Sequence, residues 1–315
     1  MNGRRFAPRA ARTAAVLAAL FLGACSASDP GPQATVAGSG ATRAATTIPA
    51  SATSAAATNA PGEAVLSGFV AFGDFGGGDA QLEVAAAMER WVADGHRVDA
   101  LVTTGDNVYD VAEPSLFEAQ LDQPYRALRA GRPMWATLGN HDVAGGYGDE
   151  ELAHLGLPPL PYVKELPGTQ LLFLDANRPD DAQARWLDEH LSVPGPPFRV
   201  VVFHQPAWSC GRHGSTDAVG EKWVPVFERH RVALVLNGHD HTYERLVSRD
   251  GVTYVVTGGG GRGLYRVRPD CMDEPDQQAA ASRHHFVAVE VGARSLRLQA
   301  IGVDGSVFDQ AVIER

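Results

Sequence analysis

Five short polar clusters in the middle of the chain contain side chains that could bind a metal. The clusters are Gly-Asp-Phe-Gly at 73–76, Gly-Asp-Asn-Val-Tyr at 105–109, Gly-Asn-His-Asp at 139–142, His-Gln-Pro at 204–206 and Gly-His-Asp-His at 238–241. Their candidate donors are Asp74, Asp106, Tyr109, Asn140, His204, His239 and His241. Oxygen and nitrogen donors suit hard to borderline divalent or trivalent ions, whereas copper(I) and iron–sulfur clusters favour thiolates.

The number of these donors indicates two metal ions. A single ion with an open coordination position uses three or four protein ligands, and the clusters supply seven. A carboxylate can bridge two ions at about 3.5–4 Å, the separation found in two-metal hydrolases. The donor set therefore favours a dinuclear centre that could activate water for hydrolysis.

The segments before the clusters predict how these donors meet. Short runs rich in Val, Leu and Phe predict buried strands at 68–72, 99–103, 134–138, 170–174, 199–203 and 232–236. Five of these six strands end at one of the polar clusters. Because open α/β sheets bind ligands at the carboxyl ends of their strands, we expect donors spread over 74–241 to converge at one edge.

Helical patterns between the strands place the chain in a mixed α/β class. Amphipathic segments predict helices at 79–93, 181–191 and 220–230. Beyond Gly251 the pattern changes to apolar runs at 252–257, 286–291, 295–301 and 306–312, with few helix signals. These runs predict consecutive antiparallel strands, so the sheets should be mixed.

The first 25 residues have the pattern of a signal peptide. Arginines without any acidic residue precede an apolar run at 14–22, which is too short to span a bilayer comfortably. The run leads into Leu-Gly-Ala-Cys, which resembles a bacterial lipobox, in which Cys25 would become the acylated first residue. We expect an extracytoplasmic lipoprotein, anchored in the membrane through Cys25 at the cell surface or the periplasmic face. A cleaved signal with an incidental cysteine is the alternative.

Composition divides the rest of the chain into a tether and one domain. Residues 26–63 are mostly Ala, Thr, Ser, Gly and Pro and contain almost no large apolar residue, which predicts a disordered tether. Residues 64–315 should form a single folded domain without internal repeats. The sequence does not predict its oligomeric state.

The net charge limits which molecules the mature protein can bind. Loss of the four arginines in the signal peptide would change the net charge from −10 to about −14. Such a negative surface disfavours nucleic acid as a partner, but a metal site could still bind a small phosphorylated molecule.

Apart from Cys25, the chain has only Cys210 and Cys271. An oxidising compartment favours a disulfide between them, and two separate thiols are the alternative.

Taken in order, the five clusters resemble the motifs of calcineurin-like metallophosphoesterases in their purple acid phosphatase form. The resemblance covers 74–241 and implies a four-layer α-β-β-α sandwich of two mixed sheets flanked by helices. It places Asp106 as the bridge between two ions. It implies two sets of ligands, namely Asp74, Asp106, Tyr109 and His241 on the first ion, and Asp106, Asn140, His204 and His239 on the second.

The same resemblance implies the chemistry of the centre. The phenolate of Tyr109 favours Fe(III), which would be partnered by Fe(II), Zn or Mn, although a packed Tyr109 beside two ordinary divalent ions is the alternative. His141 matches a family residue that contacts phosphate or protonates the leaving group. The segment 204–216 resembles short, tartrate-resistant-type enzymes, in which the residue matching His213 faces the substrate.

These observations lead us to expect a phosphomonoesterase. A metal-activated hydroxide would attack the phosphate in line, with the cations neutralising charge on the phosphoryl oxygens. A phosphodiesterase or nucleotidase with the same metals is the alternative, because the motifs specify the metals and the loops select the substrate. A non-catalytic metal-binding surface lipoprotein is a third reading.

Two other segments are expected to be structural. The glycine run at 258–261 follows a predicted strand without a helix after it, which favours a tight turn or a close approach of backbone to the metals over a nucleotide loop. His284 and His285 precede a late strand, and we expect them at the surface or at a sheet edge rather than on a metal.

Overall fold

The computed structural model describes residues 63–268 and 271–315. The predicted signal peptide with Cys25, and positions 26–62 of the predicted tether, lie outside these residues. Over the described ranges, none of the helices combines the length and the apolar character needed to cross a membrane.

The first sheet has six strands in the order β13-β12-β11-β1-β2-β3. They are β1 (Ser67–Phe72), β2 (Ala100–Thr103), β3 (Met134–Ala136), β11 (His285–Val291), β12 (Ser295–Gly302) and β13 (Val307–Glu314). β1, β2 and β3 run parallel, and β11, β12 and β13 add antiparallel strands on the other side of β1. The carboxyl ends of the three parallel strands therefore lie together.

The second sheet has seven strands in the order β10-β8-β9-β7-β6-β5-β4. They are β4 (Tyr162–Leu166), β5 (Thr169–Phe173), β6 (Phe198–Val202), β7 (Leu234–Asn237), β8 (Tyr243–Val247), β9 (Thr253–Thr257) and β10 (Asp276–Ala281). Its central strands β5, β6, β7 and β9 are parallel. The antiparallel strands β4, β8 and β10 complete the sheet.

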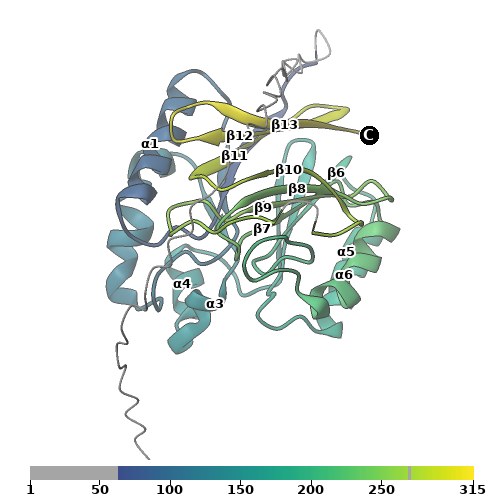
Figure 1. Ribbon diagram of the computed structural model, residues 1–315, viewed down its shortest axis with the longest axis horizontal. Helices are drawn as coiled ribbons and strands as arrows, with labels where there is room; N and C mark the ends of the chain where they lie inside the picture. The colour runs from purple at the N-terminus through teal and green to yellow at the C-terminus, as the bar shows by residue number, and fades with distance from the viewer. Residues whose placement is uncertain (1–62, 269–270) are drawn as a thin grey trace, which may run out of the picture. The chain divides into compact units, whose positions relative to one another are not determined.

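The two sheets pack face to face and helices cover their outer faces, as Figure 1 shows. Alternate apolar side chains of both sheets, such as Ala71, Val102, Val200 and Val287, form the central core. Helix α1 (Asp79–Ala93) packs Val84 and Met88 against the first sheet, while α5 (Asp181–Ser192) and α6 (Asp217–Arg229) cover the second. The expected four-layer sandwich of mixed sheets is therefore confirmed.

Shorter helices occupy the connections near the strand ends. These are α2 (Arg126–Arg129), α3 (Asn140–Val143), α4 (Gly148–His154), two 3-10 turns (Pro114–Leu116 and Ala144–Gly146) and one π turn (Glu118–Asp122). Helix α3 matters most for the site, because it begins directly after β3 with two of the residues singled out by the sequence.

Two expectations about the late part of the chain were wrong. The predicted strand at 252–257 is β9, which lies in the second sheet parallel to β7, so only β11, β12 and β13 form the consecutive antiparallel run. His285 is fully buried rather than at the surface, and its ring contacts the Thr257 hydroxyl and the Arg283 carbonyl. Burial lowers the pKa of His285 to about 4.

Candidate metal centre

The first sheet supplies the oxygen donors predicted from the sequence. Asp74 follows β1, Asp106 and Tyr109 follow β2, and Asn140 begins α3 after β3. The Tyr109 hydroxyl lies 2.9 Å from Oδ2 of Asp106 and 3.5 Å from Oδ1 of Asp74. Oδ1 of Asn140 is buried without a hydrogen-bond partner in the described structure. We call these four side chains the oxygen half of the site.

The second sheet supplies the nitrogen donors. His204 follows β6, and His239 and His241 follow β7. Nδ1 of the His204 ring contacts the Thr104 carbonyl at 2.8 Å, so this nitrogen is the donor and Nε2 faces the site. In the same way His241 directs Nδ1 to the Gly263 carbonyl at 2.7 Å. We call these three side chains the histidine half.

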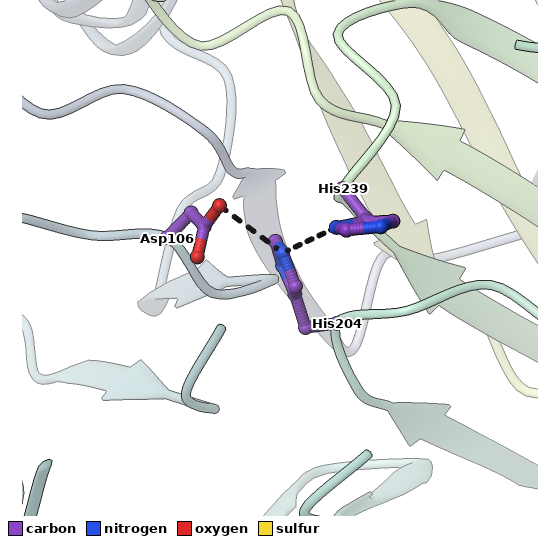
Figure 2. Close-up of side chains that lie close together, drawn as sticks. All are labelled: Asp106, His204 and His239. Carbon is purple, nitrogen blue, oxygen red and sulfur yellow. Dashed lines mark hydrogen bonds and ion pairs between the residues drawn. The ribbon is translucent and has the colours of Figure 1, made fainter. Parts of the chain in front are cut away.

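The two halves meet at Asp106, His204 and His239 (Figure 2). Nε2 of His204 lies 3.3 Å from Oδ2 of Asp106 and 3.3 Å from Nδ1 of His239. One ligand atom from each of the three residues lies within 4.8 Å of the others. On the other side, Nε2 of His241 lies 3.5 Å from Oδ1 of Asp74 and 3.4 Å from the Tyr109 hydroxyl. The structure therefore brings the donors of the two sheets into one cluster.

Three of these donors have an uncommon backbone conformation. Asp74, Asp106 and His239 have φ values of 58°, 50° and 71°. A positive φ costs free energy in residues other than glycine and persists where the surroundings impose it, often at functional sites. In each case the residue lies in the turn that follows a strand, at the carboxyl end where the other donors lie.

Glycines allow the backbone to approach the Asp74 carboxylate. A Cβ atom added to Gly258 would lie 2.8 Å from Oδ2 of Asp74, and one added to Gly238 would overlap the same oxygen. The Gly260 amide also donates to the Gly73 carbonyl at 2.9 Å. At the glycine run 258–261, the backbone therefore passes close to the candidate centre.

Burial and mutual repulsion raise the pKa values of two members of the oxygen half, Asp74 and Tyr109. Burial raises the pKa of Asp74 well above its usual value, and the charge of Asp106 adds to the rise. Burial also raises the pKa of the Tyr109 phenol, as do the charges of Asp74 and Asp106. Burial alone would also raise the pKa of Asp106, but the charge and the hydrogen bond of His204 outweigh burial and lower it. The protein therefore disfavours ionisation of Asp74 and Tyr109 and favours that of Asp106.

The histidines respond to burial and to the same carboxylates. Burial lowers the pKa of His239 to about 3, helped by His204 and His213, and burial lowers that of His241. Burial alone would also lower the pKa of His204, but the charges of Asp106 and Asp74 outweigh it and raise the value to about 9. A cation bound here would displace these protons and take over the neutralisation of the carboxylates.

The residues present therefore fit a metal. Their donor types suit hard to borderline cations. A cation would also give a partner to the buried Oδ1 of Asn140 and would offset the repulsion between the crowded acidic groups. An ion pair between His204 and Asp106 supplies part of that positive charge.

The two predicted catalytic histidines lie at different sides of the cluster. The His141 ring packs against Tyr109 at 4.3 Å between centroids, and its Nδ1 contacts the Asp110 carbonyl at 2.7 Å. The exposed His213 ring packs against His239 at 4.3 Å. Each histidine is therefore in direct contact with one of the candidate metal ligands.

Asp142 holds together two loops that carry oxygen donors. Its Oδ1 accepts the amides of Asn107 and Val108 at 2.8 and 3.0 Å, and its Oδ2 accepts the Gly139 amide at 2.7 Å. The Asn107 side-chain amide also reaches Asp142 and donates to Glu151 at 2.8 Å. This buried carboxyl group therefore holds the loops of Asp106 and Asn140 together.

The sequence missed the residues at the rim of the site. The Tyr265 ring stacks on His241 at 4.2 Å between centroids, and the Arg212 guanidinium lies over the Tyr265 ring at 5.3 Å from its centroid. The Arg262 guanidinium lies 4.2 Å from the centre of the Tyr109 ring and 3.0 Å from the Asp110 carboxylate. Arg262 and Tyr265 lie just after the glycine run, and Arg212 lies in the segment 204–216 that singled out His213. These positions were the only signals, since the contacts depend on the tertiary fold.

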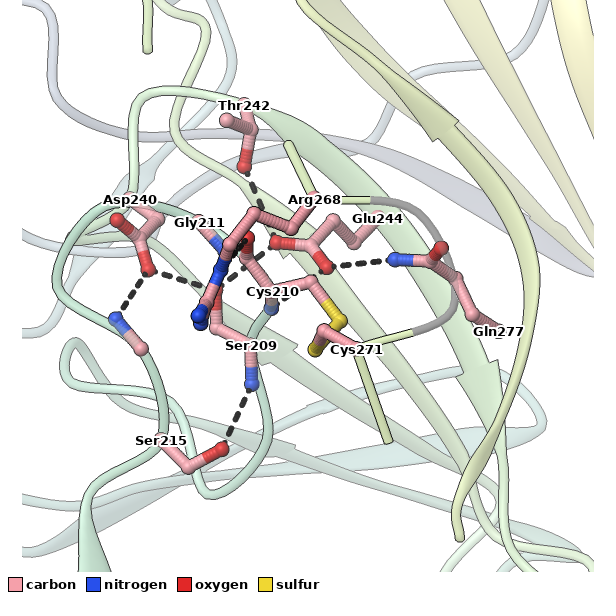
Figure 3. The surroundings of a disulfide bond; sticks show 11 residues. Ser209, Cys210, Gly211, Ser215, Asp240, Thr242, Glu244, Arg268, Cys271 and Gln277 are labelled. Atoms are coloured by element: carbon pink, nitrogen blue, oxygen red, sulfur yellow. Dashed lines mark hydrogen bonds between the residues drawn. A yellow bond between two sulfur atoms is a disulfide. The ribbon is translucent and has the colours of Figure 1, made fainter. Parts of the chain in front are cut away.

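A disulfide joins Cys210 and Cys271, with their Cα atoms 5.7 Å apart (Figure 3). It connects the loop that carries His213 to the segment before β10. The sequence left this pairing open, and the structure decides between a disulfide and two separate thiols in favour of the disulfide.

Known proteins share this architecture. A family model described as calcineurin-like phosphoesterase matches residues 68–243. Purple acid phosphatase 3 of Arabidopsis thaliana is 25% identical over 277 residues, which cover 76% of this chain and 75% of the relative. Tartrate-resistant acid phosphatase type 5 of Homo sapiens is 25% identical over 235 residues, covering 61% of this chain and 72% of the relative.

Solved structures show the same fold at lower identity. The purple acid phosphatase PPD1 from yellow lupin seeds superposes with a TM-score of 0.68 at 17% identity, covering 81% of this chain and 54% of that chain. GAP50, the anchor in the inner membrane complex of Plasmodium, superposes with a TM-score of 0.70 at 19% identity, covering 80% of this chain and 89% of that chain.

Proposed function

Because this chain belongs to the calcineurin-like phosphoesterase family, we propose that it hydrolyses phosphate esters at a pair of metal ions between its two sheets. One observation carries this proposal. Donors that follow five different strands converge on one cluster, in which Asp106 contacts both Tyr109 of its own half and His204 of the other. The purple acid phosphatases among its relatives support the same reaction class.

We assign the donors to two ions that share Asp106. Asp74, Tyr109 and His241 would complete one site, and Asn140, His204 and His239 the other. A phenolate ligand favours Fe(III) in the Tyr109 site, with Fe(II), Zn or Mn as its partner. When bound, the two cations would supply Lewis acidity toward the phosphate and lower the pKa of bound water.

The protein's own residues bind and orient the substrate. His213 and Arg212 lie on the exposed side of the histidine half, where an imidazole and a guanidinium can donate hydrogen bonds to phosphate oxygens. His141 lies beside Tyr109 and can hold or release a proton through the ring nitrogen that does not contact Asp110. A small phosphomonoester is the substrate that we propose.

Hydrolysis of a generic phosphomonoester and a generic phosphodiester, with metal analysis on the same sample, tests the proposal. We expect the metal-loaded protein to hydrolyse the monoester faster, and a strong chelator to abolish turnover. A higher rate on the diester would replace the proposed substrate class. Absence of turnover on both substrates by fully metallated protein would contradict the proposed function.

We also propose that the protein is exported and lipid-anchored. The Leu-Gly-Ala-Cys sequence that ends at Cys25 supports this, and so does the disulfide, because structural disulfides persist in oxidising compartments. Mass spectrometry of the mature N-terminus should find an acylated Cys25, and the Cys25→Ala variant should leave the membrane fraction. An unmodified N-terminus upstream of Cys25 would contradict the anchor.

A further inference from the structure

The Ser209 hydroxyl lies between two buried carboxyl groups near the histidine half (Figure 3). Oγ of Ser209 is 2.6 Å from Oδ2 of Asp240 and 2.9 Å from Oε1 of Glu244. The same oxygen accepts the Gly211 amide at 2.9 Å. The hydroxyl therefore has three polar neighbours, of which two are carboxyl oxygens.

The number of hydrogens limits how these contacts can form. A serine hydroxyl donates one hydrogen and accepts through its two lone pairs. Gly211 uses one lone pair, so the hydroxyl can donate to one carboxyl group and must accept a hydrogen from the other. If both carboxyl groups were ionised, Ser209 could satisfy only one of them, and Oε1 of Glu244 would keep only the long 3.4 Å contact from the Thr242 hydroxyl. The arrangement therefore favours a proton on one of the two carboxyl groups.

The contacts decide which carboxyl group that is. The 2.6 Å contact to Asp240 has the length of a hydroxyl that donates to an ionised acceptor. Asp240 also accepts the amides of His213 at 2.8 Å and Gly214 at 3.1 Å, as a carboxylate would. Both observations leave the proton on Glu244.

Glu244 has one oxygen free to carry it. Its Oε2 accepts the Cys210 amide at 2.9 Å and the Gln277 side-chain amide at 3.0 Å. Its Oε1 faces the hydroxyls of Ser209 and, at 3.4 Å, Thr242. Burial raises the pKa of Glu244, and the charge of Asp240 adds to this rise.

We infer that Glu244 is a positioning residue that works in its protonated form. It donates from Oε1 to Ser209, so that the Ser209 hydroxyl donates to Asp240, and Asp240 holds the loop that presents His213 beside His239. Glu244 also fixes this loop directly through the Cys210 amide. The functional part of this inference rests on the proposed phosphatase activity, because His213 acts there on the substrate.

Loss of the Glu244 proton should loosen the loop. The elements packed around Glu244 carry several titratable or charged side chains: Arg212 and His213 on the loop, Asp240 after β7, Tyr243 and Arg245 on β8, Tyr254 on β9, Asp276 on β10, and Arg268. The Arg268 amide donates to the Cys210 carbonyl at 3.0 Å. Ionised Glu244 would repel Asp240 and compete with it for the single Ser209 hydrogen. The disulfide would keep the loop attached, so the expected change is a displaced His213 rather than unfolding.

The Glu244→Gln variant tests the protonation state, because a glutamine amide can donate to Ser209 at any pH. Below neutral pH we expect this variant to keep kcat within about threefold of the wild type, whereas Glu244→Ala should lower kcat by about 10-fold or more with unchanged metal content. At alkaline pH the wild type should lose kcat earlier than Glu244→Gln. Glu165→Gln, on the edge strand β4 of the same sheet, is the matched control and should follow the wild type.

Thermal melting of the metal-free proteins gives a second readout that does not depend on turnover. A folded-state pKa above the unfolded value of about 4.3 means that this stabilisation is full at low pH and is lost as the pH rises. The melting temperature of Glu244→Gln should therefore increase relative to the wild type from pH 5 to pH 8, while Glu165→Gln should show no such trend.

Two results would overturn the inference about Glu244. One is a Glu244→Gln variant as inactive as Glu244→Ala at every pH, which would require a carboxylate. The other is a Glu244→Gln variant whose kcat falls at the same alkaline pH as that of the wild type and whose melting temperature changes with pH in the same way. A wild type that hydrolyses no phosphate ester would instead refute the proposed function. The melting comparison alone would then show whether Glu244 is protonated in the folded protein.

Discussion

The two sheets contribute chemically different halves of the site. The first sheet provides the oxygen half, in which burial and neighbouring charges raise the pKa values of Asp74 and Tyr109. The second provides the histidine half, in which burial lowers the pKa values of His239 and His241. Where the halves meet the directions reverse, because Asp106 and His204 form an ion pair that lowers the pKa of Asp106 and raises that of His204 to about 9. The proposed cations would take over the pairing with Asp106 at this junction.

Each half is also held by its own pair of buried acids, and the two pairs do different work. Asp142, with Glu151, accepts amides from loops that carry Asp106 and Asn140. Asp240, with Glu244, accepts amides from the loop of His213, which we do not assign to a metal. We therefore expect the first pair to govern metal binding and the second to govern the use of bound substrate.

The largest effect is expected where the halves join. The Asp106→Asn variant removes a charge that contacts Tyr109 and His204, and we expect it to lose metal and to lower kcat/KM on the order of 1,000-fold or more. Elemental analysis and steady-state kinetics check this, with Asp94→Asn at the exposed end of α1 as control. Normal metal content and full turnover in Asp106→Asn would show that Asp106 does not bridge two metal ions.

A smaller effect should separate the two acid pairs. Loss of groups that orient metal ligands commonly costs about 10- to 100-fold in affinity or activity. Asp142→Ala should lower the metal content at limiting metal concentration, whereas Asp240→Ala should retain metal and lower kcat. Metal titrations beside kinetics on both variants make the comparison, and the reverse pattern would show that the two pairs have been assigned to the wrong roles.

The smallest effect concerns the stability of the first pair. Burial raises the pKa of Glu151 to about 8, so the native state holds a proton that the unfolded chain releases near pH 4.3. This stabilisation is full below about pH 4.3 and is lost as the pH rises toward about 8. Glu151→Gln should therefore gain stability relative to the wild type over that range in urea unfolding of metal-free protein. A difference that stays constant with pH would show that Glu151 is ionised throughout.

Local patterns in the sequence predicted the parts of the fold that local physics controls. Helix α1 has the predicted bounds 79–93, and the buried strands at the centres of both sheets coincide closely with the apolar runs. The donors were identified because each polar cluster follows such a run. Their convergence is a property of parallel strand ends, which the pattern of strands and helices already indicates.

Such local patterns could not predict which strands pair with each other or which side chains come into contact. The edge strand β10 reads Asp-Gln-Gln-Ala-Ala-Ala and half of it is exposed, so no apolar run marks it. The place of β9 beside β7 depends on pairing between distant segments. The roles of Ser209 and Glu244 depend on hydrogen bonds across 35 positions of sequence, which only the folded chain brings together.

The metal stoichiometry of the wild-type protein tests the central claim most directly. We predict that elemental analysis of reconstituted, chelator-washed protein finds two tightly bound metal ions per chain. A reproducible value of one ion, or of none, in correctly folded protein would contradict a shared centre built by both sheets.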